Sequence, residues 1–581
     1  MLVEVCNIIF WMLNIQVEMG LSPTNYTGWG PRFLQEAITL PVVSKAEQDL
    51  SHMDICKTQI WNLIGTSERK ECDLPDIVTT LEVLSSIRHP NHHHCTPAMC
   101  MVQRLSSTHL KQQCKCFQEN CEQLTIVIGP LSNAVRSGTP TAWLLDGTRL
   151  TRRDEPYLAL SHVWSDGTGD GTKQQGTVNR CLFKYFARIA ARLKCTGIWW
   201  DTLSLPKDED VRSEALKSMH TNYAQAECTV VHNDFLLNQE FKNSENACLA
   251  LVLSPWFTRG WTALELAMSK NVKVLFKGST SNDPDIRDLS NEILASGPAT
   301  VSRAHWLATC AIKRIIRIND LTEVIAILSQ RYTSWEEDRV KIASLLAGVG
   351  EPDFRGTASE ITQRLIHHFG RVPYSVVLHD HPTMTEAGGF SWCPPRVDEM
   401  PIDVRRDLDL DDDEEGDLTV EPDGSVTGIW LTRPVSIIDI MEKRLQPRSK
   451  DPAVIQKIQT ALESWGQCLI LYQDVQLDRQ ALLVKTIEVS PGDGVIDCQY
   501  VGVIVDAKAE PKHDNTGIAN WLDAVMPDGE KELGNRYCPF PIRLGKNFSI
   551  TGGNRRKEKG DGDDDDSHAW KILNEAQKIR L

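Results

Sequence analysis

The sequence has no excess of positive charge and no long apolar run, and each absence excludes a class of function. It contains 62 Lys and Arg residues against 78 Asp and Glu residues, for a formal net charge of -16. Because no basic stripe is present to displace the counterions of a nucleic acid, we expect no nucleic-acid partner. The most apolar stretch, residues 1–17, is shorter than the ~20 residues that span a bilayer, and it carries Glu4 where a signal peptide has Lys or Arg. We therefore expect a buried helix or strand there, and no membrane partner.

No secretory signal accompanies the 17 cysteines. Disulfide bonds form in oxidising compartments, so we expect these thiols to be reduced or bound to metal in a cytoplasmic protein. At 581 residues the chain is too long for one hydrophobic core. Its content of 41% hydrophobic and 24% charged residues is ordinary for a globular protein.

Shifts in hydrophobic period and two acidic runs, residues 407–417 and 561–566, divide the chain into segments. Helical spacing follows the central region, an acidic run marks residues 407–417, and short β-prone runs follow that run. The predicted segments are 1–145 as an N-terminal region with a Cys/His cluster, 146–280 as an α/β domain, 281–400 as a helical region, 401–420 as an acidic loop or linker, 421–550 as a small β-rich domain and 551–581 as a mobile tail.

Short apolar runs alternate with helical spacing in the 146–280 segment, which is typical of parallel strands joined by crossover helices. Ligands of such sheets bind at the carboxyl ends of the strands, where His162, Asp166 and Asp201 fall. The expected strands are residues 157–163, 198–203, 229–232 and 272–276.

Each polar residue of this segment has a structural and a functional interpretation. Asp201 ends an apolar strand, where a carboxylate needs a partner, and Arg259 is a candidate partner for it or for a ligand phosphate. His162 on a buried strand is more often a core histidine than a catalyst. Glu265 has a structural interpretation as the partner of Thr262 in a capping box. Its functional interpretation is a site carboxylate near the strand ends.

A loop rich in Gly, Thr and Asp, residues 165–172, follows the first strand. Its backbone N–H groups could bind a phosphate, but it lacks the Lys-Ser/Thr ending of a P-loop. A mobile surface loop is the alternative interpretation. A phosphate role requires it to lie over the carboxyl ends of the strands.

Four motifs follow one another in the 146–280 segment. They are Tyr157, Ala159, Leu160, Ser161, His162 and Trp164, then Trp199, Trp200 and Asp201, then Met219, Tyr223 and Ala226, and finally Trp256, Arg259, Trp261, Thr262 and Glu265. Four motifs in this order resemble the heterokaryon-incompatibility (HET) domain of fungal proteins. The chain departs from many such domains at Ser165, where they have Gly, and at Leu203–Pro206, where they have Cys-Ile-Asn-Gln.

The HET resemblance implies a role in self/non-self recognition, incompatibility or cell death. HET domains are in turn similar to TIR domains, whose Ser-x-Trp-Cys-Leu-x-Glu-Leu motif resembles residues 259–266, Arg-Gly-Trp-Thr-Ala-Leu-Glu-Leu. This similarity implies a TIR-like doubly wound, mostly parallel sheet, and possible cleavage of NAD at the nicotinamide–ribose bond. Glu265 and Asp201 would then be catalytic. The residues that would bind substrate are His162, Trp164, Asp166, Gly167, Arg259 and Trp261.

Two non-catalytic functions compete with this enzyme. One is a signalling module that acts through self-association or through contacts with other HET or death-pathway proteins. The other is a domain that binds a nucleotide messenger without turnover.

The N-terminal region carries two like-spaced cysteine pairs, Cys95-x4-Cys100 and Cys116-x4-Cys121. Thiolates in two pairs across a loop are typical of a tetrahedral structural zinc site, which we predict at these four residues. Reduced thiols without metal are the alternative. A catalytic zinc is not expected, because the two pairs fill all four ligand positions.

Overall fold

The structure is a computed structural model. It describes residues 44–64, 70–83, 92, 95–96, 100, 112–114, 116, 121–169, 176–280, 283–316, 318–349, 356–401, 417–472, 480–490, 494–506, 538–545 and 572. The predicted N-terminal apolar segment, the acidic loop up to residue 416, residues 170–172 and nearly all of the predicted tail lie outside these residues.

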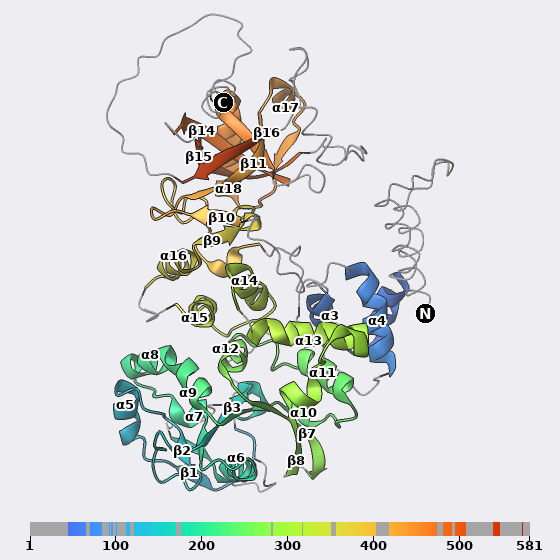
Figure 1. The fold of residues 1–581 in the computed structure, drawn as a ribbon, viewed down its shortest axis with the longest axis vertical. Coiled ribbons are helices and arrows are strands. Elements are labelled where there is room, and N and C mark those ends of the chain that lie inside the picture. Colours follow the sequence, from blue (N-terminus) through green and yellow to red (C-terminus); the bar gives the residue numbers. More distant parts are fainter. Residues whose placement is uncertain are drawn as a thin grey trace, which may run out of the picture. The chain divides into compact units, whose positions relative to one another are not determined.

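The chain divides into two compact units, and the division falls inside helix α14 (Leu321–Ser329) (Figure 1). Unit 1 comprises Met1–Ile318, Ile327–Leu346 and Val404–Leu410. Unit 2 comprises Asn319–Ala326, Ala347–Asp403 and Asp411–Leu581.

Unit 1 is built on a six-stranded mixed sheet in the order β2-β5-β3-β6-β7-β8. The four central strands pair in parallel, and both edge strands pair antiparallel to their neighbours. The strands are β2 (Trp143–Leu144), β3 (Tyr157–His162), β5 (Gly197–Trp199), β6 (Cys228–His232), β7 (Val272–Thr280) and β8 (Asp283–Asp288). β3 and β6 are buried along their whole length, as strands covered on both faces are.

Helix α6 (Arg180–Arg192) packs an apolar side against this sheet. Its Leu182, Phe186 and Ile189 lie against the core that holds Trp143 and Trp200. The other helices of unit 1 are α3 (Lys57–Ile64), α4 (Lys70–Val83), α5 (Gly129–Arg136), α7 (Asp201–Ser204), α8 (Glu209–Lys217), α9 (Met219–Gln225), α10 (Asp234–Leu237), α11 (Ser244–Val252), α12 (Gly260–Met268), α13 (Arg303–Ile316) and α15 (Glu337–Leu346). A separate two-stranded sheet joins β1 (Gln123–Thr125) to β4 (Thr177–Asn179).

Unit 2 contains a closed five-stranded barrel. The pairing runs from β11 through β13, β14, β15 and β16 and returns to β11. Only the β15–β16 pair of this ring is parallel. The strands of unit 2 are β9 (Arg371–Pro373), β10 (Asp417–Val420), β11 (Val426–Pro434), β12 (Leu445–Pro447), β13 (Cys468–Tyr472), β14 (Gln480–Val489), β15 (Ile496–Asp506) and β16 (Cys538–Leu544).

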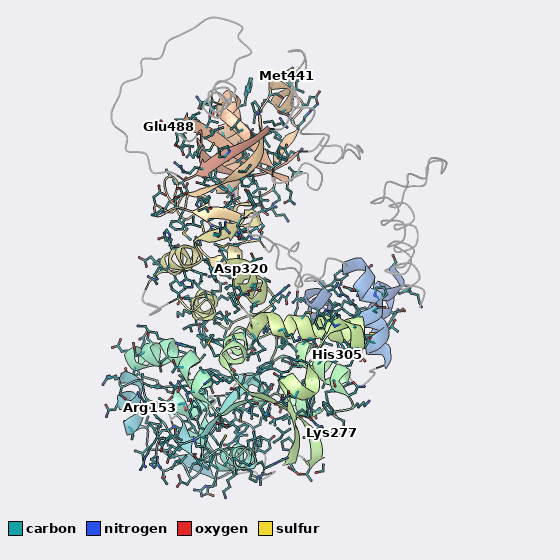
Figure 2. The ribbon with its side chains drawn as sticks, viewed as in Figure 1. Arg153, Lys277, His305, Asp320, Met441 and Glu488 are labelled. Atoms are coloured by element: carbon teal, nitrogen blue, oxygen red, sulfur yellow. The ribbon has the colours of Figure 1, made fainter. Side chains whose placement is uncertain are left out.

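Among the described residues of unit 2, further helices are α16 (Ala358–Phe369), α17 (Ile437–Met441) and α18 (Pro452–Glu463). Helix α18 packs Ile458 into an apolar cluster with Ile470, Leu483 and Ile504 of the barrel strands. Short α17 instead exposes apolar side chains, including Met441, which Figure 2 labels.

The predicted TIR-like, doubly wound and mostly parallel fold is wrong. The protein is a mixed α/β chain, with antiparallel strands at both edges of the unit 1 sheet and a closed barrel in unit 2. The apolar runs identified the central strands, but β2 has two residues and β8 reads Asp-Pro-Asp-Ile-Arg-Asp, so neither carries an apolar pattern. Barrel closure depends on which distant strands pair, and hydrophobic period contains no such information.

We expect Trp430→Ala in β11 to destabilise unit 2 by about 3–5 kcal/mol, because its side chain is 1% exposed and packs edge-on against Tyr374. Ile429→Ala is the matched control, since Ile429 is 61% exposed on the same strand. Hydrogen exchange of the β13–β15 amides in increasing denaturant measures the loss. Equal effects of the two variants would contradict the burial of Trp430.

Candidate functional site

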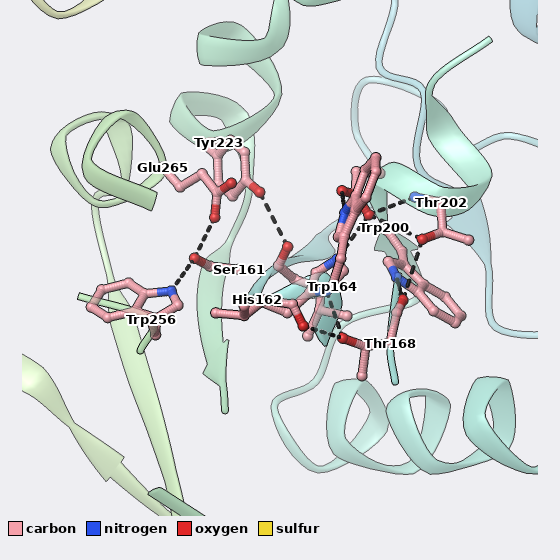
Figure 3. Close-up of polar contacts among 12 residues, drawn as sticks. Ser161, His162, Trp164, Thr168, Trp200, Thr202, Tyr223, Trp256 and Glu265 are labelled. Carbon is pink, nitrogen blue, oxygen red and sulfur yellow. Dashed lines mark hydrogen bonds and ion pairs between the residues drawn. The ribbon is translucent and has the colours of Figure 1, made fainter. Parts of the chain in front are cut away.

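A polar cluster lies where β3 and β5 end (Figure 3). His162 is the last residue of β3, and Asp201 follows β5 as the first residue of α7. These two strands are parallel neighbours, so their carboxyl ends meet at one edge of the sheet. The structure therefore brings two of the predicted site residues into direct contact.

His162 bridges Asp201 and Thr168. Its Nε2 lies 2.7 Å from Oδ1 of Asp201, and its Nδ1 lies 2.6 Å from the Thr168 hydroxyl oxygen. The Thr168 hydroxyl also lies 3.2 Å from the carbonyl oxygen of Val163, to which it can donate. If Thr168 donates there, its oxygen accepts from Nδ1, and both ring nitrogens of His162 carry protons. This geometry suits an imidazolium paired with the Asp201 carboxylate.

Charge and burial act in opposite directions on this pair. Burial alone would lower the pKa of His162, but the attraction and hydrogen bond of Asp201 outweigh burial and raise it. Burial would raise the pKa of Asp201, whereas His162 lowers it, with help from hydrogen bonds donated by Trp164 Nε1 at 2.6 Å and the Thr202 amide at 2.6 Å. Both groups are therefore held in their charged forms.

Glu265 belongs to a second polar group, on α12. The Ser161 hydroxyl donates to Glu265 Oε2, and Trp256 Nε1 donates to the Ser161 oxygen at 2.7 Å (Figure 3). The hydroxyl of Tyr223 donates to the carbonyl oxygen of Leu160 at 3.1 Å and also influences the pKa of the Glu265 carboxyl group. The N-cap of α12 is Arg259 and receives no side-chain cap, so Glu265 does not form the capping box with Thr262.

The two groups lie on opposite faces of β3. Successive side chains of a strand point to opposite faces, so Ser161, which holds Glu265, points away from His162. The aromatic contacts show the same separation into two faces. Of the successive residues Trp199 and Trp200, the first packs against Tyr223 and the second against His162. The structure therefore does not bring the two predicted catalytic carboxylates, Glu265 and Asp201, into contact.

Burial raises the pKa of Glu265 to about 7, and the nearby charge of Asp201 adds to this rise. Hydrogen bonds from Ser161 and Tyr223, and the charge of His162, act in the opposite direction. Only 8% of the residue is exposed. Glu265 is therefore a carboxyl group poised to change charge near neutral pH.

Arg259 and Trp261 begin helix α12. Burial lowers the pKa of the Arg259 guanidinium, while the carboxylates of Glu265, Asp201, Asp338 and Asp166 act in the opposite direction. In the described part of the chain, this guanidinium has no hydrogen bond or ion pair. Trp261 Nε1 donates to Asp338 at 2.9 Å, and the same Asp338 carboxylate acts on the Arg259 guanidinium.

The described part of the Gly-rich loop is packed rather than exposed. Asp166 accepts from Asn233 Nδ2 at 2.6 Å and from the Asp234 amide at 3.0 Å, while burial raises its pKa to about 6. Gly167 has φ +72°, and a Cβ there would lie 2.3 Å from Gln113 Cγ, so only glycine fits. Thr168 is fully buried, and its carbonyl accepts from Trp200 Nε1 at 3.0 Å. Residues 165–169 thus support His162.

The cysteine pairs separate into two groups that could each hold a metal ion. Cys95 and Cys100 lie with Cys56 and His92, whereas Cys116 and Cys121 lie with Cys114 and Cys181. Within each group the ligand atoms lie within 4.8 Å of one another. The sequence had predicted one zinc site formed by Cys95, Cys100, Cys116 and Cys121, whereas the structure places the two pairs in different groups.

Sequence reasoning left several of these residues without a role. Ser161, Tyr223 and Trp256 match the HET motifs but were not assigned to the site, although their motif positions were a usable signal. Thr168 stood inside the predicted loop without a role of its own. Cys56 and Cys181 are distant in sequence from their partners, so spacing gave no signal for them.

Comparison with known proteins identifies no relative: the chain matches no protein-family model, no curated protein and no solved structure. The resemblance to HET domains rests on the motif residues alone. Within the part of the chain that the structure describes, none of the helices combines the length and apolar character needed to cross a membrane.

The raised pKa of Glu265 predicts that the free energy of unfolding depends on pH. Between pH 4.5, the usual pKa, and about 7 the unfolded chain releases this proton while the folded chain keeps it, so stability falls as pH rises. Above pH 7, ionisation of Glu265 lowers the free energy of unfolding by about 3 kcal/mol. Glu265→Gln keeps an acceptor for Ser161 and removes the titration. We expect the variant to gain about 3 kcal/mol relative to wild type between pH 4.5 and 8, measured by urea unfolding. A pH-independent difference would contradict the burial argument.

Proposed function

We propose that this chain is a cytoplasmic HET-domain protein of self/non-self recognition or cell-death signalling. We propose further that its 146–280 region binds NAD or a related nucleotide and cleaves the nicotinamide–ribose bond. The observation that carries this proposal is the Glu265 carboxyl group, which is buried next to the end of β3 and lies in the field of the Arg259 guanidinium.

The chemistry suits a single buried carboxylate. The bond between ribose C1′ and the pyridinium nitrogen breaks, and its electron pair leaves with a neutral nicotinamide. Positive charge then develops on the ribose, where an ionised Glu265 stabilises it more strongly in a buried site than in water. Water adds to C1′ and releases one proton, which Glu265 can accept.

Arg259 supplies a charge of the sign that a diphosphate requires. Its half-buried guanidinium has no bonded partner among the described residues, and the nearby Asp338 carboxylate accepts from Trp261 Nε1. The other predicted catalytic and substrate-binding residues act differently in this proposal. The His162–Asp201 pair, with Trp164, positions the end of β3 from the opposite face and does not touch the substrate.

We also propose that zinc is the metal of the two Cys/His groups. One group offers three thiolates and an imidazole, and the other offers four thiolates. Soft thiolate ligands in sets of four select zinc over the hard cations and leave no open position for catalysis. These sites would be structural.

A non-catalytic module that acts through self-association or a death-pathway partner is the second candidate. The observation that favours it is the burial of Glu265, which accepts from the Ser161 hydroxyl and is only 8% exposed. A cavity of about 220 Å³ lies elsewhere in unit 1, against Thr141, Leu205 and Asn222, and no predicted site residue lines it. An enzyme would have to open the α12 side of β3 to admit substrate.

We expect Glu265→Gln to lower nicotinamide release from NAD by roughly 100-fold or more, because the isosteric amide cannot stabilise a ribosyl cation. Release is measured on purified full-length protein, and the melting temperature is measured on the same sample. The matched control is Glu227→Gln. Glu227 is an exposed acid that precedes the amino end of β6, away from the carboxyl ends of the strands, so this variant should retain wild-type activity. Wild-type protein that releases no nicotinamide would favour the non-catalytic module, and an active Glu265→Gln would remove Glu265 from the mechanism.

A further inference from the structure

The group formed by Cys114, Cys116, Cys121 and Cys181 joins segments that are far apart in the sequence. Cys181 stands in the first turn of α6, and Cys121 precedes β1. The antiparallel β1–β4 pair brings them together, with the Arg180 amide donating to the Glu122 carbonyl at 2.9 Å. The Sγ atoms of Cys121 and Cys181 are consequently 3.4 Å apart.

The sulfur geometry of this group suits one shared ion. Zinc–sulfur bonds of about 2.3 Å in a tetrahedron place sulfurs about 3.8 Å apart. Cys114 lies 3.3 Å from Cys181, close to that separation. Cys114 and Cys116 lie 2.6 Å apart, which is longer than the disulfide distance of about 2.05 Å but shorter than the separation around a shared ion, so this pair must open by about 1.2 Å to bind one. All four residues are half-buried, so an ion can reach them from solvent.

The segment that ends at Cys114 contacts the loop that supports His162. The Gln113 amide donates to the Gly167 carbonyl at 2.9 Å, and its side chain packs on the Cα of Gly167. The preceding Gln112 accepts from the Asn179 amide at 2.8 Å. Cys114 is thus one residue from the contact with Gly167, and Thr168, the partner of His162 Nδ1, is the next residue of the loop.

We infer that Cys114, Cys116, Cys121 and Cys181 bind one structural zinc ion that clamps residues 112–114 onto the 165–169 loop and so positions His162. The Cys56, His92, Cys95 and Cys100 group binds a second, independent zinc ion, so each chain holds two. The clamp acts through Gln113 and Gly167. Its consequence for activity rests on the proposed function, whereas the zinc count and the order of the loop do not.

The test counts zinc in full-length protein purified in reductant without chelator. Wild type should hold two zinc ions per chain, and Cys181→Ser and Cys95→Ser should each hold one. Cys468→Ser, a buried cysteine of unit 2 that donates to the Ala461 carbonyl as serine also can, is the control and should hold two. Fewer than two ions in folded wild type, two ions in Cys181→Ser, or a Cys114–Cys116 disulfide in peptide mass spectra would overturn the assignment.

Hydrogen exchange of residues 163–169 tests the clamp separately from the count. Exchange should rise at least tenfold in Cys181→Ser and remain at the wild-type rate in Cys95→Ser. If Cys181→Ser does not fold, chelator is added to Cys95→Ser, whose remaining ion belongs to the clamp, and zinc is then restored. Reversible loosening of residues 163–169 supports the clamp. Unchanged exchange after loss of the ion overturns it, whatever the result with NAD.

Discussion

The ion pair between His162 and Asp201 is the interaction on which the polar end of the unit 1 sheet depends. Both side chains are largely removed from water, where a lone charge is costly. Each group compensates for the burial of the other, and Trp164, Thr168 and the Thr202 amide use their remaining hydrogen-bonding capacity. Removal of one partner would leave an uncompensated charge at the end of two central strands, so the contacts around it form a mutually dependent set.

Glu265 differs from Asp201 because no cation is bonded to it. Its neighbours Ser161 and Tyr223 are neutral, so burial dominates and the carboxyl group keeps its proton up to about neutral pH. Asp201 has a bonded imidazolium and stays ionised. Two carboxyl groups near one strand end thus have pKa values moved in opposite directions, which is the arrangement expected where acid and base roles are divided. The strand between them also separates them in space, which argues for one reacting carboxylate rather than a cooperating pair.

Unit 2 is stabilised by a different constraint, the closure of its barrel. Strand β16 pairs with β11 on one side and with β15 on the other, so no edge remains open in the ring. β13 is buried at every position because helix α18 and its cluster cover one side of the sheet. The β-prone runs in the sequence were sufficient to expect strands here, but their ring closure was not visible in them.

The sequence by itself determined the buried central strands of unit 1, since continuous apolar runs ending in His162 and Asp201 are local features of the chain. It also pointed to Glu265, Arg259 and Trp261 through motif positions. Tertiary structure alone decided which of these residues meet. The alternation of β3 puts Ser161 and His162 on opposite faces, so Glu265 and Asp201 do not pair. The β1–β4 pairing brings Cys181 to Cys121 across sixty positions of sequence. The alternation within β3 follows from its being a strand, whereas the pairing of distant segments depends on the folded chain, and no local pattern of residues encodes that pairing.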